Sequence, residues 1–295
     1  MIQKILDLHI HSKYSRACSP GLDLFSIAQA CETLGIDIVS TGDFTHPKWF
    51  DHIKESLVED TEGIYKLKNP SVPAGTAFLG KGSGQIPSKA HFILGTELSC
   101  IKKHKDKTRR IHVLVYAPNL GVVEKFNKTL GEMGFNLKSD GRPILGLTVK
   151  QLLEIMLDVD KRMVMIPAHA WTPWFGIFGS KGGYDSLEEA FEELTPNIFA
   201  IETGLSSDPI MNWRLSMLDN IALVSNSDAH SCAKLGREAN VMDFESEKDI
   251  TYKNIFDYIK NRDKKHFKYT IELYPEEGKY HWDGHRDCKF VCDPE

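Results

Sequence analysis

The chain has 295 residues, enough for one large domain or two small ones, and its 41% hydrophobic and 26% charged residues are ordinary for a globular protein. No apolar run approaches membrane-spanning length, no secretion signal opens the chain, and the six scattered cysteines argue against a disulfide framework and favour a reducing cytoplasm. The formal net charge of −5 argues against nucleic acid as a partner, but bound divalent ions would neutralise several carboxylates, so net charge excludes no substrate class.

Apolar runs with β-branched residues alternate along the chain with stretches of helical periodicity. The predicted strands are 4–8, 36–41, 92–96, 111–116, 163–167, 198–202 and 221–225. The predicted helices are 23–34, 46–59, 122–131, 148–158, 186–194, 210–219 and 250–261. This alternation predicts parallel βα units, and about seven of them in roughly 260 residues favour a closed α/β barrel. A doubly wound sheet would want a glycine-rich turn after the first strand, and Leu8 to Ser12 is not one.

Three segments do not fit this repeat. Residues 61–90 are rich in Gly, Pro, Ser and Lys and are interpreted as an inserted hairpin or ordered loop over the barrel mouth. Residues 171–185 form a long aromatic and glycine-rich loop after the fifth predicted strand. The expected organisation is a catalytic barrel over 1–270, with the insertion at 61–90, followed by a polar tail at 271–295.

Metal-type side chains recur at the ends of the predicted strands. His9 and His11 alternate at the end of the first strand and so project from one side of it, and Asp228-Ala229-His230 follows the last strand. The strands between them supply Asp43, Glu97, His169 and Glu202, and His112 lies near the start of the fourth run. In barrel enzymes the C-terminal strand ends share one mouth, so these side chains are expected to converge.

The number of candidate ligands exceeds the need of one tetrahedral zinc, which predicts a cluster of two or three ions bridged by a carboxylate such as Glu97. Imidazole and carboxylate ligands suit Zn²⁺ or Mn²⁺, with Mg²⁺ as a further candidate. Such clusters activate a water and clamp the attacking and leaving oxygens of phosphoryl transfer. The sequence therefore predicts a phosphoester hydrolase in which Asp228, Glu97 and His11 are catalytic.

Basic residues are concentrated in one short stretch. Within nine positions the chain carries Lys102, Lys103, His104, Lys105, Lys107, Arg109 and Arg110. This cluster is either a solvated loop or a local attraction for nucleic acid, and the sequence leaves both interpretations open.

The segment from Asp7 to Ser15 resembles the opening motif of the polymerase and histidinol phosphatase (PHP) superfamily. Later motifs of that superfamily have counterparts in Thr41-Gly42-Asp43, Gly95-Thr96-Glu97, His112-Val113-Leu114, Pro167-Ala168-His169 and Ser227-Asp228-Ala229-His230. The resemblance runs from about residue 1 to 270 and implies a distorted (β/α)7 barrel with a trinuclear zinc or manganese centre.

By that resemblance the metal ligands divide into three sets. One ion would be held by His9, His11, Glu97 and Asp228, a second by Glu97, His112 and His169, and a third with the help of Asp43 and His230. The chain departs from the superfamily at one point, because Asp43 is followed by Phe44 where an Asp-His pair is common. His46 is either a substitute ligand or a solvated histidine at a helix start.

A narrower resemblance is to the endonuclease Q family of DNA repair nucleases in archaea and some bacteria. The segments that carry it are Thr41 to Asp43 through Pro47 to Trp49, Pro167 to Gly179, Glu202 to Pro209, Met211 to Arg214, Ser225 to His230 and Leu235 to Glu238. It implies cleavage of the DNA backbone on the 5′ side of deaminated bases (uracil, hypoxanthine, xanthine) or abasic sites. Two alternatives stay open: a phosphatase or nucleotidase acting on small phosphomonoesters or nucleic-acid ends, and a DNA-binding module with a vestigial metal centre.

The loops that resemble this family contain candidate substrate contacts. An enzyme that inspects a base must hold it out of the stack between apolar faces, and Trp171, Trp174, Phe175 and Phe178 would supply such faces. The alternative is that these aromatic side chains plug the barrel mouth. The candidate phosphate clamps, each equally a surface salt-bridge partner, are Lys181, Arg214, Lys234 and Arg237.

The polar tail resembles the segment that leads into the C-terminal zinc-finger region of endonuclease Q. Its metal-type residues, His281, His285, Cys288 and Cys292, match no common zinc-finger spacing. We expect the tail to be a partial remnant of that region, in a truncated chain or in a natural single-module relative.

Overall fold

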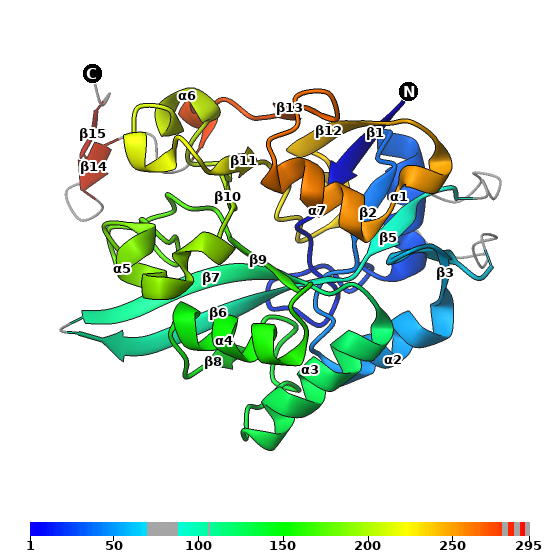
Figure 1. Ribbon diagram of the computed structural model, residues 1–295, viewed down its shortest axis with the longest axis horizontal. Helices are drawn as coiled ribbons and strands as arrows, with labels where there is room; N and C mark the ends of the chain where they lie inside the picture. The colour runs from blue at the N-terminus through cyan, green and yellow to red at the C-terminus, as the bar shows by residue number, and fades with distance from the viewer. Residues whose placement is uncertain (70–87, 106, 279–282, 286–289, 293–295) are drawn as a thin grey trace.

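The first strand, β1 (Ile2–Asp7), lies in the interior of a seven-stranded sheet (Figure 1). The structure is a computed structural model of the chain. It describes residues 1–69, 88–105, 107–278, 283–285 and 290–292. The strands of this sheet, in spatial order, are β13 (Phe267–Ile271), β12 (Ala239–Phe244), β1, β2 (Ile38–Ser40), β5 (His91–Ile93), β4 (Ile64–Leu67) and β3 (Leu57–Thr61). Only β1, β2 and β5 pair in parallel. The predicted mixed α/β class is therefore confirmed, but with many antiparallel pairs.

A second, separate sheet has four strands. Its order is β8 (Ile144–Leu145), β6 (Gly95–His104), β7 (Lys107–Tyr116) and β9 (Val164–Pro167), and a further parallel pair consists of β10 (Ala200–Glu202) and β11 (Ala222–Val224). In the tail, β14 (Asp283–His285) and β15 (Phe290–Cys292) pair antiparallel.

The described strands form separate sheets, so the predicted single closed sheet of parallel strands is not shown. Single backbone hydrogen bonds nevertheless link the sheets at one end. The amide of Ala170 donates to Glu202 at 2.8 Å, and the amide of His11 donates to Ala229 at 3.1 Å. The segments that follow β1, β9, β10 and β11 are thereby held together, and these segments carry most of the predicted metal ligands.

The prediction that all strands run parallel is wrong at β7. Only two residues separate the end of β6 from the start of β7, so the chain has no length for a crossover and β7 must run back antiparallel to β6; it also pairs antiparallel with β9. The predicted insertion at 61–90 begins within the β3–β4 hairpin, which ends the second predicted helix at Ser56, and residues 70–87 lie outside the described residues. The antiparallel strands β12 and β13 were not predicted.

Helices occur in each predicted interval. They are α1 (Leu24–Leu34), α2 (Pro47–Ser56), α3 (Leu120–Glu132), α4 (Val149–Val159), α5 (Leu187–Phe191), α6 (Pro209–Asn212) and α7 (Tyr252–Lys260). Asp23 caps α1 by accepting from the amides of Phe25 and Ser26, and Gly35 ends it in the left-handed conformation. No helix among the described residues is long and apolar enough to cross a membrane.

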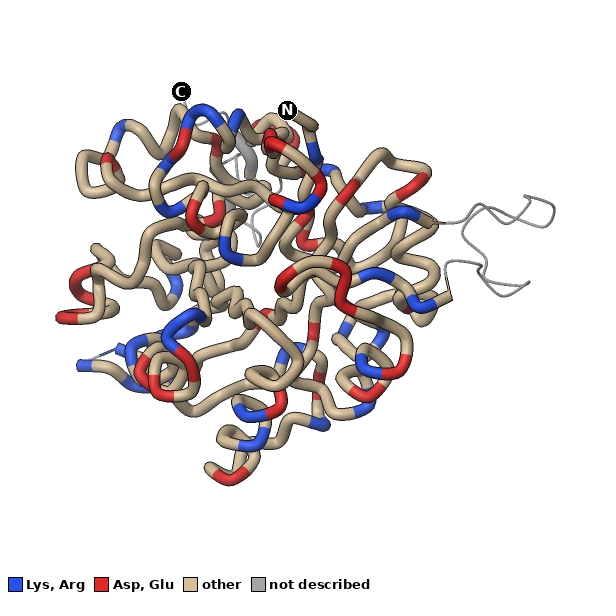
Figure 2. Tube along the Cα trace, turned by 45° about the vertical axis from the view of Figure 1, so that its right-hand side comes forward, with Lys and Arg blue, Asp and Glu red and all other residues tan. Residues whose placement is uncertain are grey.

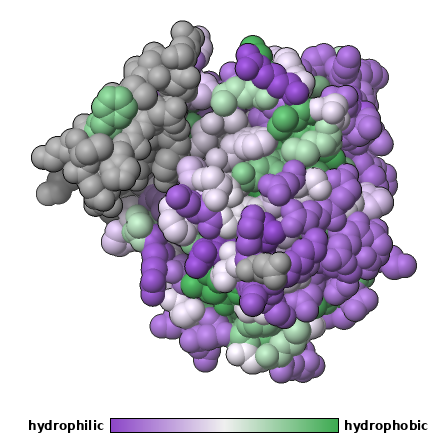
Figure 3. Space-filling model, turned by 90° about the vertical axis from the view of Figure 1, so that its left-hand side faces the viewer, coloured by the Kyte–Doolittle hydropathy of each residue, from purple (hydrophilic) through white to green (hydrophobic). Residues whose placement is uncertain are grey.

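The β6–β7 hairpin extends beyond the rest of the fold (Figure 1). Lys and Arg gather along it (Figure 2), and the side of the molecule that carries its tip has a largely hydrophilic surface (Figure 3). Its inner half is buried: Leu98, Cys100, Ile111 and Val113 belong to the hydrophobic core. The hairpin is therefore anchored at one end and solvated at the other.

Candidate metal centre

His9 and His11 lie directly after β1, and both rings are buried. The segment that carries them is fixed by the segment after β11, because the Leu8 amide donates to the Asn226 side chain at 2.8 Å and the His11 amide donates to Ala229. The two rings therefore point into the centre of the molecule beside Asp228, as their alternation predicts.

Three sets of side chains bring their ligand atoms within 4.8 Å of one another. They are His9, His11 and Glu97; His11, Asp228 and His230; and Glu97, His112 and His169. Each set has an imidazole nitrogen and a carboxylate oxygen, which is the donor chemistry that Zn²⁺ and Mn²⁺ accept.

Glu97 lies between two of these sets. Its Oε1 atom is 2.9 Å from Nδ1 of His112 and 3.1 Å from Nε2 of His169. Its Oε2 atom is 3.4 Å from Nε2 of His11 and 3.8 Å from Nε2 of His9. Each oxygen thus faces one pair of imidazoles, which is the arrangement that a bridging carboxylate needs.

Two further carboxylates hold the outer sides of the rings. Nδ1 of His9 donates to Glu202 at 3.0 Å, and Nδ1 of His11 donates to Asp43 at 3.2 Å. Because an ionised carboxylate can only accept, these bonds keep the proton on Nδ1 and leave Nε2 facing the centre. Such outer carboxylates orient metal-binding histidines and raise their basicity.

Asp43, which is expected to help hold an ion, lies outside the three sets. Its Oδ2 atom accepts from the amide and the hydroxyl of Ser12, both at 2.7 Å, and from the hydroxyl of Ser15 at 2.8 Å. His46, the candidate substitute ligand, also lies outside the sets and stacks on Tyr14 with 4.3 Å between ring centroids.

The backbone is left-handed at three residues of the site. The φ angles are 47° at Asp43, 30° at His169 and 47° at Asp228, a conformation that costs non-glycine residues free energy and that clusters at functional sites. Next to His169, a Cβ atom on Gly204 would lie 2.6 Å from the His169 Cβ, so only glycine fits there.

His112 reaches the centre from the middle of a strand. Because β7 runs antiparallel to β9, the C-terminal end of β9 lies beside the middle of β7, where Val113 pairs with Pro167 and His112 precedes it. The strand reversal therefore explains how a residue in mid-strand reaches the centre.

Arg142 is a member of the site that the sequence analysis missed. Its guanidinium donates to Oε2 of Glu97 at 2.8 Å and lies in the loop before β8, where no periodicity or motif marks it. The acidic surroundings raise its pKa further above the usual arginine value, so it stays charged.

The pKa shifts show how the cluster balances charge. Burial opposes the ionisation of Glu97, but His112 and Arg142 outweigh it and lower the pKa of the carboxyl. Burial likewise opposes protonation of His11, but its bonds to Asp228 and Asp43 raise the pKa of the ring to about 9. Burial lowers the pKa of His112 to about 4, although the charge of Glu97 opposes this shift.

The residues of the cluster fit divalent metal ions. Nε2 of His9 is buried and makes no hydrogen bond among the described residues, although Asp228 Oδ1 is 3.5 Å away. Several buried carboxylates share the cluster with protonated histidines, and a metal ion would take the place of those protons. The donor set fits metals of the zinc and manganese class without choosing between them.

A cavity of about 620 Å³ opens beside the cluster. Its lining includes His112, Arg142, His169, Asp228, His230 and Arg237 together with Trp174 and Phe175. Phe175 stacks on His112 with 4.2 Å between ring centroids, and the Trp174 side chain is 48% exposed. A second cavity of about 540 Å³ adjoins it at Asp228 and His230 and is lined by Lys234 and Arg237.

The other predicted substrate contacts lie away from this cavity. Trp171 packs against Phe178 and donates its indole N–H to Asn212, so both rings support the loop. Lys181 and Arg214 are exposed and line neither of the two cavities. The side chains of His281, His285, Cys288 and Cys292 lie outside the described residues.

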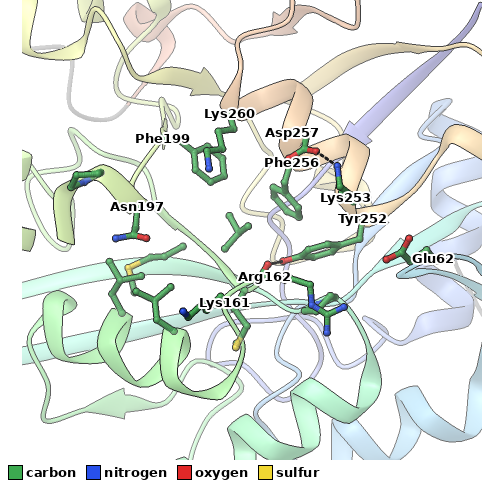
Figure 4. A pocket seen from close by; sticks show the side chains of 17 residues that line it. Glu62, Lys161, Arg162, Asn197, Phe199, Tyr252, Lys253, Phe256, Asp257 and Lys260 are labelled. Carbon is green, nitrogen blue, oxygen red and sulfur yellow. Dashed lines mark hydrogen bonds and ion pairs between the residues drawn. The ribbon is translucent and has the colours of Figure 1, made fainter.

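A smaller cavity of about 290 Å³ lies elsewhere, beneath α7. Figure 4 shows the rings of Tyr252, Phe256 and Phe199 around it, with the Lys253–Asp257 ion pair at its edge. None of the three metal-type sets among the described residues contributes to its lining.

Comparison with known proteins agrees with this geometry, although no family model matches the chain. The uncharacterized protein YqxK of Bacillus subtilis (strain 168) is 30% identical over 79% of this chain and 57% of its own length. The crystal structure of PfuEndoQ, a lesion-specific endonuclease from Pyrococcus furiosus, has a TM-score of 0.77 and 29% identity over 95% of this chain and 62% of that one.

A second crystal structure, of endonuclease Q with a 27-mer duplex carrying an abasic lesion at the active site, has a TM-score of 0.81 and 29% identity. The match covers 99% of this chain and 65% of that one, so the chain spans less than two thirds of these relatives. The predicted resemblance is confirmed: over nearly its whole length, the chain is similar in sequence and in structure to endonuclease Q.

Proposed function

We propose that the chain is a metal-dependent DNA repair endonuclease that hydrolyses the backbone on the 5′ side of deaminated or abasic nucleotides. The observation that carries the proposal is the juxtaposition of Glu97, with its four surrounding imidazoles, and a cavity walled by Trp174 and Phe175. The similarity to endonuclease Q bound to an abasic duplex supports DNA as the substrate.

The metal-binding residues in this proposal are His9, His11, Glu97, His112, His169, Asp228 and His230. Divalent ions held there supply Lewis acidity and neutralise charge on the phosphate during hydrolysis. Glu202 and Asp43 act through the rings, because their bonds to Nδ1 present Nε2 of His9 and His11 to the centre.

The remaining side chains bind and orient the substrate. Arg142 and Arg237 line the cavity and bring positive charge to the phosphodiester, where a guanidinium donates in a fork that matches phosphate oxygens. Trp174 and Phe175 offer faces for an extruded base or for the nucleotides that flank an abasic site, and such stacking is worth ~1–3 kcal/mol for each base.

The test begins with the metal content of the purified protein, for which we expect two to three zinc or manganese ions per chain by elemental analysis. The loaded protein is then incubated with end-labelled duplexes that carry one uracil, hypoxanthine, xanthine or abasic site, beside an undamaged duplex. We expect cuts 5′ of the lesion, and loss of cutting after treatment with a chelator.

Three outcomes would contradict the proposal. One ion or none per chain would remove the multinuclear centre. Intact lesion strands alongside fast turnover of a small phosphomonoester would instead favour a phosphatase. An Asp228→Ala protein that cuts lesion DNA at the full rate would exclude the metal cluster from the reaction.

A further inference from the structure

The basic residues of the β6–β7 hairpin are divided between two opposite faces. Side chains alternate along each strand, and residues directly opposite each other share a face. The pairs Lys102–Arg109 and His104–Lys107 therefore lie on one face, and the pairs Ile101–Arg110 and Lys103–Thr108 lie on the other. The sequence shows one basic cluster, whereas the hairpin separates it in two.

The first face is packed against the protein itself, although Lys107 makes no ion pair among the described residues. Arg109 is buried, donates to Glu189 at 2.7 Å and lies 4.2 Å from the Tyr184 ring centroid. Lys102 donates to Gln151 at 2.8 Å, and His104 lies 3.6 Å from Glu192. This face binds α4, α5 and the turn that follows α5, so its charges serve the fold.

The second face, formed by Lys103, Thr108 and Arg110, is open. Neither Lys103 nor Arg110 makes an ion pair within the part of the chain that the structure describes, and Lys103 is exposed. The guanidinium of Arg110 lies 5.9 Å from the ring centroid of Trp174, which lines the cavity. We call these three residues the open face.

The open face continues the face of β7 that forms the metal centre. Arg110 stands two residues before His112, so the two side chains project from the same side of the strand ~7 Å apart. The loop of Phe175 runs beside both positions, because the His112 amide donates to Phe175 at 2.8 Å and the Arg110 amide donates to Gly182 at 3.2 Å. Positive charge therefore leads outward from the centre along one side of the hairpin.

We propose that the open face binds the phosphate backbone of the DNA strand that enters the metal centre, with Lys103 and Arg110 each contacting a phosphate. The inference rests on the proposed function and extends it to a sequence-independent contact outside the cavity. Charge complementarity identifies the occupant, since unpaired cations in line with a phosphodiesterase site suit a polyanion. The net charge of −5 does not oppose this, because the acidic residues near the hairpin face the other side.

The test compares two doubly substituted proteins with equal changes of charge. Lys103→Gln with Arg110→Gln alters the open face, and Lys102→Gln with Lys107→Gln alters the opposite face as the matched control. Binding of an undamaged duplex is measured at several salt concentrations. We expect the slope of log K against log salt to be smaller in magnitude by about 2 for the open-face double variant than for the parent, since each lost phosphate contact removes about 1.

The control protein should keep the parental slope, and Lys103→Gln with Arg110→Lys should recover about half of the loss. Equal slopes for the parent and the open-face protein, or equal losses in both double variants, would overturn the inference while the proposed function stands. A parent that binds and cuts no DNA would overturn both. Melting temperatures of all variants report on folding. If the parent protein bound an acidic peptide as tightly as it binds DNA, that result would also count against the proposal.

Discussion

The protein encloses two groups of carboxylates whose surroundings differ in charge. At the metal centre, Glu97 lies among histidine rings and Arg142, and its pKa is lowered although burial opposes ionisation. Beside β12, Glu238 is fully buried near the half-buried Glu272, with only the Leu273 amide donating to it among the described residues. Burial, and then the charge of Glu272, raise the pKa of Glu238 to about 8, and burial raises that of Glu272 to about 7.

The difference shows that burial alone does not make a metal site. A buried carboxylate without a cationic neighbour keeps its proton, because the charged form loses its hydration without compensation. A buried carboxylate that faces imidazoles stays ionised and adds to a site that attracts cations. One substitution, Glu→Gln, removes a charge with little change of shape, and its effect should depend on the group in which it is made.

The largest effect is expected for Glu97→Gln. The amide keeps the shape but removes the charge that lies between the two histidine pairs, so both sets should lose metal. We expect hydrolysis of lesion DNA to fall by more than about 100-fold, beyond the range for residues that act through a ligand. Metal per chain and the initial rate measure this, and a fully loaded, active Glu97→Gln protein would show that Glu97 does not bridge.

A smaller effect is expected for Glu202→Gln. This carboxylate contacts Nδ1 of His9 and the backbone amide of His169 but lies outside the three ligand sets, so its loss should weaken metal binding by about 10–100-fold without removing the site. A titration of the metal-free protein with Zn²⁺ measures the affinity. Unchanged affinity would mean that the bond to His9 serves the fold alone, which a lowered melting temperature would then reveal.

The smallest effect on metal binding and activity is expected for Glu238→Gln, which should instead stabilise the fold. Since the pKa of this carboxyl rises from 4.5 to about 8 on folding, the native state holds more protons than the unfolded state between these values, and stability falls as pH rises through this window. The glutamine mimics the protonated acid and leaves the metal centre unchanged, so its effect is on stability alone. We expect it to raise the free energy of unfolding by up to about 4 kcal/mol at pH 8 and by almost nothing at pH 4.

Urea unfolding of both proteins at the two pH values measures this difference. Glu124→Gln, on the exposed side of α3, is the matched surface control. A Glu238→Gln protein that is less stable than the parent at pH 8 would mean that the carboxylate has a cationic partner in solution, and the contrast between the two groups would fail.

Much of the metal centre was predictable because its residues follow local rules. The alternation of His9 and His11 at a strand end, and the Asp228-Ala229-His230 segment after another, are visible in the sequence and lie together in the structure. The aromatic loop was also identified correctly as a neighbour of the centre. The sequence does not tell which of the loop's side chains face the cavity and which support the loop. Trp174 lines the cavity, whereas Trp171 supports the loop through Asn212, a residue 41 positions away.

The sequence by itself determined many of the strands, the intervals that hold the helices and the residue types at the strand ends, since hydrophobic periodicity is a property of neighbouring residues. Only the tertiary structure decided which strands run antiparallel. The antiparallel direction of β7 is the reason that His112 reaches the centre from mid-strand. It also decided that Asp43 and Glu202 lie behind histidine rings, that Arg142 joins Glu97, and that the basic hairpin has one face packed against the protein and one open face. Each of these depends on contacts between distant residues, and no local pattern encodes which charges meet.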